Sequence, residues 1–331
     1  MSSNRSLAGR CLWLLAALLL VGCGGGGGSA AIGGVSGSNP FANLPPVPVI
    51  SIAKKISGFS VGPFVLAGQD PNQGGSAPSD QLLFLIADAA QYSTWIRTFG
   101  TSGTLQLAGQ YIHQSGAKAM IGAFLAAPST SAAISANQQE LDRLVTIANA
   151  GQADIVTVGN ESLFSGALTE SQLLGYIVYV KARVPASVQV ATVDTWNVLV
   201  QHPAVIAAED VVLANIYPFY ENSSASNAVI TLQADYAKIK QAVGTKTLMI
   251  TETGWPSSGA PPSQAPAATP SLANQISYFV AAEQWARQNN IVLIWFEAFN
   301  EPWKANYGDY SSWGLFDASF LIESIFQAAF Q

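Results

Sequence analysis

Charge, cysteine and histidine are all scarce in this sequence. Only 10 % of its 331 residues are Asp, Glu, Lys or Arg, and it has two Cys and two His. A typical globular protein has about 25 % charged residues. A nucleic-acid-binding protein needs clustered basic residues, but the 14 Lys and Arg here are outnumbered by 20 Asp and Glu and form no cluster. A metal site built by the protein needs several His, Cys or suitably spaced carboxylates. We therefore expect no nucleic acid, no metal and no cofactor among the ligands.

The amino-terminal residues have the pattern of an export signal. Two arginines precede an apolar run of eleven residues at 11–21. Such a run is too short to span a bilayer, which takes about 20 residues, but it suits the hydrophobic region of a signal peptide. The letters LVGC at 20–23 resemble the lipobox of bacterial lipoproteins. The resemblance implies cleavage of residues 1–22 and acyl chains on Cys23, whereas an ordinary secretory signal with a chance cysteine is the alternative.

Residues 23–49 are expected to form a lipidated cysteine and a flexible tether. After Cys23 the sequence is rich in Gly, Ser and Ala and then in Pro, a composition that cannot offset the entropy of ordering. Its five consecutive Gly lack the Gly-Lys-Ser/Thr ending of a phosphate-binding loop. By resemblance to Gram-negative lipoproteins, Gly24 favours the outer membrane, so we expect an envelope protein anchored to the membrane through Cys23. Because no second thiol then remains for a disulfide, the core alone must stabilise the domain at 50–331.

Eight short hydrophobic segments recur along this domain. Their interiors are continuously apolar, which is typical of strands buried on both faces. They lie at 56–64, 94–99, 118–125, 154–160, 187–195, 210–217, 245–252 and 290–297. Between them are segments with helical spacing, at 80–90, 138–150, 171–184, 228–243 and 272–288, and a capping-box pattern at Thr169 and Gln172. This alternation predicts a parallel sheet. Eight units in about 280 residues favour a single α/β domain, a (β/α)8 TIM barrel, over an open doubly wound sheet.

Polar residues end several of the hydrophobic segments. Because the active site of a (β/α)8 barrel lies at the carboxyl ends of its strands, these side chains are candidates for chemistry: Arg97, Asn160, Glu161, Asp194, Tyr217, Glu252 and Glu297. A carboxylate buried there without a partner costs several kcal/mol. In a purely structural interpretation, each glutamate is paired with Arg97 or Lys304. Two carboxylates that face one cavity suit glycoside hydrolysis instead, with retention at a separation of about 5–5.5 Å and inversion at about 6.5–9.5 Å.

Aromatic residues concentrate near the same segment ends. Each by itself is more often part of a core, but together they suit a sugar, because pyranose C–H faces stack on aromatic rings. The candidates for sugar contact are Phe64, Tyr217, Trp255, Trp295, Trp303 and Trp313.

Several sequence strings together resemble glycoside hydrolase family 17. They are IRTFGT at 96–101, VGNE at 158–161, NIYPF at 215–219, ITETGWPSSG at 250–259, WFEAFNEPWK at 295–304 and WGLF at 313–316. They occur in the expected order, and the ETGWP match is highly specific. The resemblance implies a (β/α)8 barrel that acts on β-1,3-glucan as a hydrolase or glucanosyltransferase.

The resemblance also assigns roles to individual residues. It implies that Glu161 is the acid/base and Glu252 the nucleophile of a retaining mechanism. Asn160 would bond the sugar 2-hydroxyl, and Tyr217 would lie close to the nucleophile. A polar cluster after the eighth strand would support the site, formed by Glu297, Glu301 and Lys304. With Arg97, Phe64, Trp255 and Trp303, these residues make up the expected substrate-binding set.

Two positions depart from the family pattern. Many members have Tyr-Gly where Val61-Gly62 stands, and plant members often carry Glu where this chain has Tyr310, next to Asp309. These departures affect the assignment of sugar subsites and leave the catalytic pair unchanged.

The expected mechanism requires opposite protonation states in the two catalytic carboxyls. Glu252 must be ionised to attack the anomeric carbon, and Glu161 must carry a proton for the leaving oxygen. The charge of Glu252 and an apolar wall would both favour the protonated form of Glu161. Once Glu252 becomes an ester, its charge is lost, and Glu161 can ionise and act as base for water or a sugar hydroxyl.

Two other function classes remain as alternatives. Residues 58–62 fit the G-x-S-x-G pattern of a serine esterase, in which His113 or His202 would complete a triad with Ser60. That segment, however, runs into Pro63 instead of opening a helix. The second alternative is a non-catalytic glucan-binding lipoprotein. We expect a monomer, and the sequence leaves open whether water or sugar is the acceptor and whether attack is endo or exo.

Overall fold

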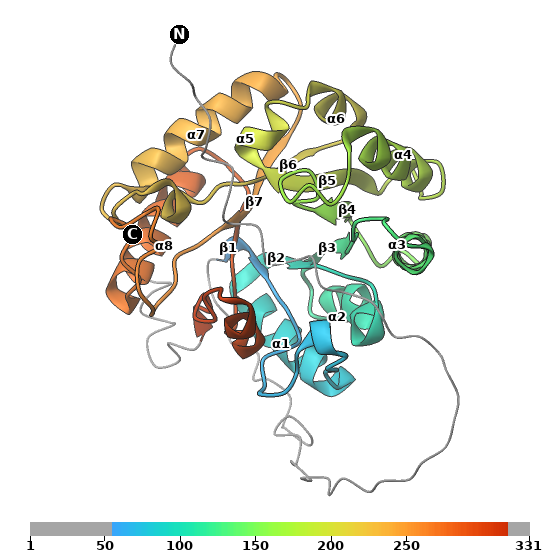
Figure 1. Ribbon diagram of the computed structural model, residues 1–331, viewed down its shortest axis with the longest axis horizontal. Coiled ribbons are helices and arrows are strands. Elements are labelled where there is room, and N and C mark those ends of the chain that lie inside the picture. Colours follow the sequence, from blue (N-terminus) through green and yellow to red (C-terminus); the bar gives the residue numbers. More distant parts are fainter. Residues whose placement is uncertain (1–54, 317–331) are drawn as a thin grey trace, which may run out of the picture.

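A computed structural model describes residues 55–316, and within them eight parallel strands close into a barrel in the order β1 to β8 (Figure 1). The strands are β1 (Ile56–Ser60), β2 (Ser93–Thr98), β3 (Lys118–Ala123), β4 (Ile155–Asn160), β5 (Gln189–Thr195), β6 (Val212–Asn215), β7 (Leu248–Thr253) and β8 (Leu293–Trp295). Each falls within or overlaps one of the eight expected segments, so the predicted (β/α)8 barrel is confirmed.

Helices surround the barrel on its outside (Figure 1). They are α1 (Ser79–Tyr92), α2 (Ala108–Gln114), α3 (Ser131–Asn149), α4 (Glu170–Lys181), α5 (Trp196–Leu199), α6 (Pro203–Ala208), α7 (Ala228–Val243) and α8 (Leu272–Gln288). The capping box is confirmed at the start of α4, where Thr169 and Gln172 bond reciprocally. Helix α3 begins at Ser131 instead of near residue 138, because Thr130 caps it and its first turns are made of small residues.

The strands divide their side chains between two cores. Alternate residues such as Ile121, Val156 and Val190 pack in the larger cluster with the helices. The residues between them on β3 to β7 form a separate cluster inside the barrel, with Met120, Ile155, Ala191, Val193, Val211, Leu213 and Met249. This two-residue period explains why the strands are apolar throughout, since both faces are buried. The inner cluster also fills one end of the barrel, and polar groups occupy the carboxyl ends of the strands at the other end.

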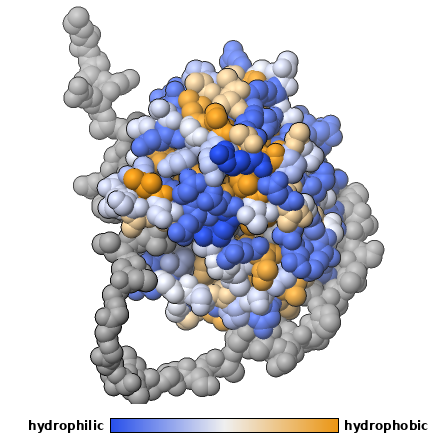
Figure 2. Space-filling model, turned by 90° about the vertical axis from the view of Figure 1, so that its right-hand side faces the viewer, coloured by the Kyte–Doolittle hydropathy of each residue, from blue (hydrophilic) through white to orange (hydrophobic). Residues whose placement is uncertain are grey.

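The surface mixes polar and apolar residues, as the face in Figure 2 shows. The most exposed large apolar side chains lie on different helices, namely Ile134, Val178 and Ile230. Within residues 55–316, none of the helices combines the length and apolar character that crossing a bilayer requires. The proposed signal peptide, Cys23 and the tether lie outside the described residues.

Candidate active site

Two strands contain an extra residue at the ends that carry the candidate residues. On β4 the irregularity lies between Thr157 and Asn160, opposite β5. On β7 it lies between Ile250 and Thr253, and the pairings with both β6 and β8 show it. Extra residues of this kind bend a strand and redirect its side chains. The bends therefore turn the ends of β4 and β7 into the mouth of the barrel.

The segment that carries Glu161 has an unusual backbone. Gly159 has φ of 82° and Glu161 has φ of 49°, a left-handed conformation that is costly for a residue with a side chain. A Cβ at Gly159 would lie 2.5 Å from Ser162 Oγ, so glycine is required there. Buried Asp194 fixes the following turn, since its Oδ2 accepts from the N–H groups of Leu163 and Phe164 at 2.9 and 3.4 Å. The tertiary structure thus stabilises a conformation that the local sequence would not adopt alone.

Both carboxylate oxygens of Glu252 accept hydrogen bonds. Arg97 Nη1 lies 2.5 Å from Oε1, and the Tyr217 hydroxyl donates to Oε2 at 2.7 Å. The Glu252 side chain is nearly buried, at 6 % exposure. Charge-assisted bonds of this kind are strong and hold a carboxylate in one orientation. Glu252 therefore has the environment of a nucleophile.

Glu161 has the opposite electrostatic environment. Burial, with smaller contributions from the charges of Glu252 and Asp194, raises its pKa from 4.5 to about 8, against the lowering effects of Asn215 and Arg97. At neutral pH Glu161 therefore carries a proton. This agrees with the expectation that the apolar surroundings and the charge of Glu252 keep the acid protonated.

Arg97 joins the two halves of the site. One of its terminal nitrogens binds Glu252, while Nη2 donates to Asn160 Oδ1 at 2.7 Å. The guanidinium is 1 % exposed and lies over the ring of Phe99, 4.4 Å from its centroid. Arg97 was expected to bind substrate, but its buried position makes it a residue that orients Glu252 and Asn160. Because Asn160 Oδ1 is occupied by Arg97, its amide nitrogen is the group left for a sugar hydroxyl.

The polar cluster after β8 is buried and self-contained. Lys304 Nζ lies 2.6 Å from Glu297 Oε2 and 3.0 Å from Glu301 Oε2, and it sits over the ring of Phe296. Burial raises the pKa of Glu297 well above its usual range, although Lys304 opposes this effect. The three groups were expected to support the site, and their burial, at 1 to 5 % exposure, makes them a support beneath it and not direct sugar contacts. The ion pairs of the purely structural interpretation are also present, because Arg97 pairs with Glu252 and Lys304 pairs with Glu297 and Glu301. These pairs are compatible with a catalytic role for Glu252.

Lys304→Met is expected to destabilise the fold by about 3 kcal/mol or more, because it leaves Glu297 and Glu301 buried without their cation. Urea unfolding measures this loss. Lys181→Met is the matched control, since Lys181 pairs with Asp210 at the surface, where both side chains are about a third exposed, and should cost under about 1 kcal/mol. Equal losses in the two variants would contradict the assignment of a buried cluster.

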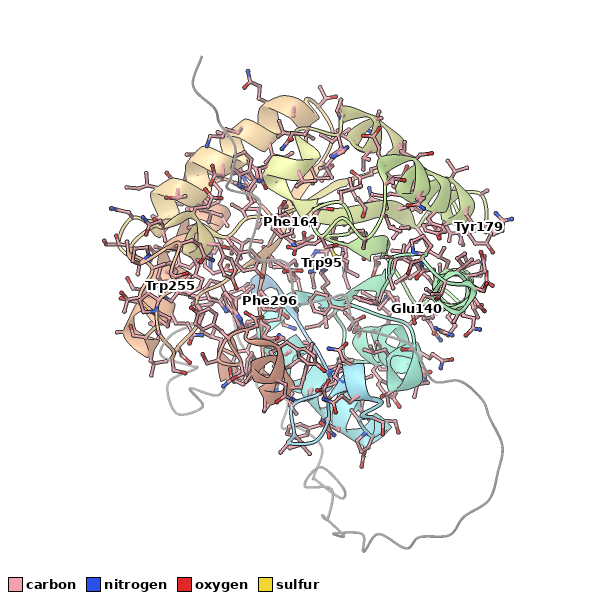
Figure 3. The ribbon with its side chains drawn as sticks, viewed as in Figure 1. Trp95, Glu140, Phe164, Tyr179, Trp255 and Phe296 are labelled. Carbon is pink, nitrogen blue, oxygen red and sulfur yellow. The ribbon has the colours of Figure 1, made fainter. Side chains whose placement is uncertain are left out.

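The aromatic candidates separate into buried and partly exposed groups. Trp255, Trp295 and Trp313 are at most 1 % exposed, so the expectation that Trp255 stacks on substrate is corrected. Its indole N–H donates to the carbonyl of Thr269, and its ring packs against Phe219. The partly exposed group is Phe64, Tyr217 and Trp303. Figure 3 places Phe164 and Phe296 near the barrel axis and Trp255 farther out, toward α8.

The two departures from the family pattern have different environments, since Val61 is buried whereas Asp309 and Tyr310 are partly exposed. Val61 is fully buried, so it offers no contact to a ligand. Gly62 lies against Glu301, whose Oε1 would be 2.1 Å from an added Cβ. Tyr310 donates its hydroxyl to the carbonyl of Ala260, and Asp309 accepts from Tyr220.

The esterase interpretation lacks a triad among the described residues. Ser60 is fully buried, and its hydroxyl has no hydrogen-bond partner in the part of the chain that the structure describes. The ring of His113 bonds Asp154, and that of His202 bonds Glu170. Neither histidine therefore activates Ser60.

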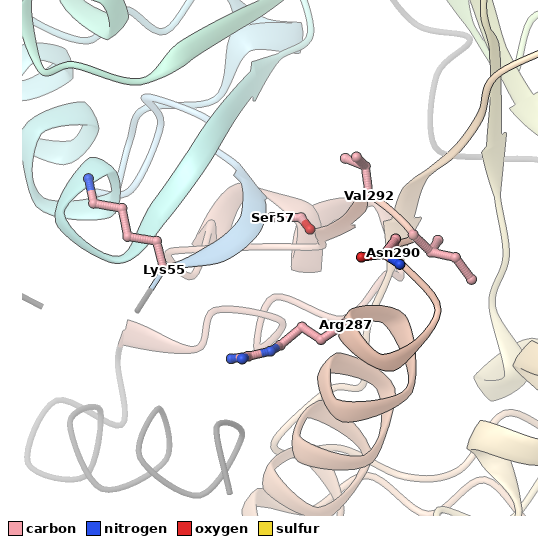
Figure 4. Close-up of a pocket in the computed structure, with 6 residues that line it drawn as sticks. Lys55, Ser57, Arg287, Asn290 and Val292 are labelled. Atoms are coloured by element: carbon pink, nitrogen blue, oxygen red, sulfur yellow. The ribbon is translucent and has the colours of Figure 1, made fainter. Parts of the chain in front are cut away.

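A pocket at the other end of the barrel is separate from these groups. Lys55, Ser57, Arg287, Asn290, Ile291 and Val292 line it (Figure 4). These residues precede or begin β1 and β8 or end α8. The two catalytic candidates lie instead where strands end. No group of three or more metal-ligating side chains is found in the described part of the chain.

Comparison with known sequences identifies the family. The BtgE/BtgC glycoside hydrolase domain matches residues 66–314. The chain belongs to this family. Glucan 1,3-beta-glucosidase BGL2 of Candida albicans is 30 % identical over 258 residues, covering 69 % of this chain and 80 % of the relative. A glucan 1,3-beta-glucosidase of Schizosaccharomyces pombe is 30 % identical over 240 residues, covering 67 % and 72 %.

Solved structures agree with this membership of the BtgE/BtgC family. A glycoside hydrolase family 17 β-1,3-glucanosyltransferase of Rhizomucor miehei superposes with a TM-score of 0.67 at 26 % identity, covering 78 % of this chain and 92 % of that one. An active-site mutant of a β-1,3-glucanosyltransferase from the same organism, in complex with laminaritriose, gives a TM-score of 0.66 at 26 % identity, covering 78 % and 91 %. The resemblance to glycoside hydrolase family 17 is thereby confirmed.

Two residues of the site were not assigned a role from the sequence. Asn215 donates from Nδ2 to Glu161 Oε1 at 2.9 Å, and Thr251 donates from Oγ1 to Asn215 Oδ1 at 3.0 Å. Both lie in the strings that carry the family resemblance. The signal in the sequence was that a polar residue, Asn215, ends the sixth hydrophobic strand. Its partner Glu161 is 54 residues away in sequence, so the local pattern did not indicate the bond.

Proposed function

We propose that this chain is a retaining glycoside hydrolase or transglycosylase that acts on β-1,3-glucan. One observation carries the proposal: two carboxyls at the same barrel mouth have opposite electrostatic environments. Glu252 accepts from a guanidinium and a phenol, while the pKa of Glu161 is raised to about 8 by burial and by Glu252 itself. A nucleophile and a general acid need these two environments. The substrate class follows from the named activities of the relatives.

In the first half-reaction, a Glu252 oxygen attacks the anomeric carbon and forms an ester. The bond from that carbon to the glycosidic oxygen breaks, and the leaving oxygen takes the proton of Glu161. Arg97 and Tyr217 hold the nucleophile in place. Asn160, oriented by Arg97, presents its amide nitrogen to the sugar 2-hydroxyl.

In the second half-reaction, Glu161 acts as a base. Esterification removes the charge of Glu252, which is one cause of the raised pKa of Glu161, so the Glu161 carboxylate becomes easier to maintain. It accepts a proton from the acceptor hydroxyl as that oxygen attacks the anomeric carbon. Glu252 leaves as a carboxylate. Two displacements at one carbon give net retention, with water producing hydrolysis and a sugar hydroxyl producing transfer.

The decisive experiment incubates the protein with a reduced laminari-oligosaccharide and resolves the products by mass. Shorter products alone mean hydrolysis, and additional longer products mean transfer. Proton NMR of the first products should show the β anomer. Binding without any change in chain length would contradict the proposal and support a non-catalytic glucan-binding protein.

We also propose that Cys23 anchors a monomeric enzyme at the cell envelope. The support is the LVGC string after a short apolar run, followed by a Gly- and Pro-rich stretch. Cys23→Ala should release the protein from the membrane fraction and abolish its labelling by a clickable fatty acid, with glucanase activity retained. Cys11→Ala is the matched control. Equal labelling of wild type and Cys23→Ala would contradict lipidation.

A further inference from the structure

The amide of Asn215 lies between the two catalytic strands. Asn215 ends β6 and is 1 % exposed. Its Nδ2 donates to Glu161 Oε1 at 2.9 Å, and its Oδ1 accepts from the hydroxyl of Thr251 at 3.0 Å. Thr251 is fully buried on β7 and directly precedes Glu252. One amide thus connects the acid/base to the strand that carries the nucleophile.

This bond distinguishes the two oxygens of Glu161. An amide nitrogen only donates, so a carboxyl proton on Oε1 would point toward the two hydrogens of the Asn215 amide. The proton of the acid therefore belongs on Oε2. That oxygen accepts no hydrogen bond from any described residue, and it is not among the buried atoms that lack a partner. Oε2 is accordingly the oxygen open to the mouth of the barrel.

The same orientation of the amide serves both half-reactions. When Glu161 is a carboxylate, only the nitrogen end of Asn215 can satisfy Oε1. If the amide were reversed, its oxygen would face Glu161 and hold the acid proton on Oε1, away from the leaving group. The Thr251 hydroxyl satisfies Oδ1 in the productive orientation, so that no buried acceptor is left unpaired.

We infer that Asn215, oriented by Thr251, is a positioning residue that directs the transferable proton of Glu161 to Oε2. The inference deepens the proposed function and rests on it. The Asn215 bond also lowers the pKa of Glu161 against the raising effect of burial. Removing the bond should therefore raise that pKa above its value of about 8.

Asn215→Ala tests the inference through the pH profile. The alkaline limb of kcat/KM should move to higher pH, and kcat on laminari-oligosaccharides should fall by about 10- to 100-fold with KM nearly unchanged. With an aryl laminaribioside that has a dinitrophenolate leaving group, kcat/KM should fall much less, because in the first step that group departs without a proton. A merely structural residue would lower both activities alike and leave the limb in place.

Two sets of variants separate positioning from folding. Asn137→Ala is the matched control, because Asn137, which lies on α3, is also 1 % exposed, and its amide accepts from the N–H of Ala126 and donates to the carbonyl of the same residue. It should reduce stability without moving the limb. Thr251→Val should move the limb in the same direction as Asn215→Ala, and Thr251→Ser should restore the wild-type profile. The Thr251 pair keeps the test decisive if Asn215→Ala does not fold.

Two outcomes distinguish this inference from the proposed function. If the wild type cleaves glucan, and Asn215→Ala and Thr251→Val leave both the alkaline limb and the leaving-group dependence unchanged, the positioning role is wrong and the proposed function stands. If the wild type neither cleaves nor transfers glucan, the proposed function fails before any variant is compared.

Discussion

Glu252→Ala is expected to lower kcat on laminari-oligosaccharides by on the order of 10⁴-fold. The variant retains the general acid Glu161 but has no oxygen that can form the glycosyl ester. Arg97 then loses its carboxylate partner and remains a buried cation, so a loss of stability of about 3 kcal/mol or more should accompany the loss of activity. Steady-state kinetics and thermal unfolding of the same preparation measure the two effects.

Azide can identify the role of Glu252 directly. In Glu252→Ala the space of the missing side chain admits this small anion, which attacks a β-glycosyl substrate with a good leaving group from the nucleophile's side. The expected product is an α-glycosyl azide. Glu283→Gln is the matched control, because Glu283 is a fully buried glutamate on α8 whose carboxyl has no hydrogen-bond partner within residues 55–316. Near-wild-type activity of Glu252→Ala would exclude Glu252 as nucleophile.

Glu161→Ala is expected to lower kcat by about 10²- to 10⁴-fold on oligosaccharides, the range that general acid–base catalysis contributes. The loss should be much smaller for the first step of a dinitrophenyl glycoside, which needs no proton. The glycosyl ester should then accumulate, since its release needs a base. Azide needs no base and should restore turnover with a β-glycosyl azide product. An equal loss on both substrates would contradict the acid/base role of Glu161.

Ionisation of Glu161 also predicts how activity and stability depend on pH. With a pKa of about 8, the wild-type kcat/KM should fall as the pH rises through this value. Because folding raises the pKa from 4.5 to about 8, the folded state binds this proton more tightly, and stability is lost as the pH rises between these values. Glu161→Gln cannot ionise. It should therefore raise Tm relative to wild type at about pH 9 and much less at about pH 5.

The barrel was predictable because its signals are local. Eight apolar segments, the helical spacing between them and the capping box at Thr169 each occupy one short stretch of sequence. Helix α3 shows the limit of this approach, since its first turns, from Ser131, consist of small residues without an apolar stripe. The cap at Thr130, bonded to the N–H of Ala133, is what marks the start of the helix.

The position of Glu161 and Glu252 at one mouth was predictable for a related reason. Glu161 and Glu252 follow apolar strands directly, and parallel strands of a barrel bring their carboxyl ends to one mouth. The roles of Arg97 and Trp255 were not predictable in the same way. An arginine at a strand end can face a ligand or its neighbours, and a tryptophan after a strand can be a platform or a core residue. Only their burial, at 1 % and 0 % exposure, decides between these alternatives.

The amino-acid sequence by itself determined the barrel, the order of its strands and the two carboxyls at its mouth, because apolar periodicity and residue type act within a few positions. The tertiary structure decided the electrostatic environment and the orientation of those carboxyls. Arg97 reaches Glu252 across 155 positions and Asn215 reaches Glu161 across 54. The raised pKa of Glu161 comes from burial by distant segments. Hydrogen bonds and desolvation act over a few ångströms, and only the closed barrel brings such separated residues within that range.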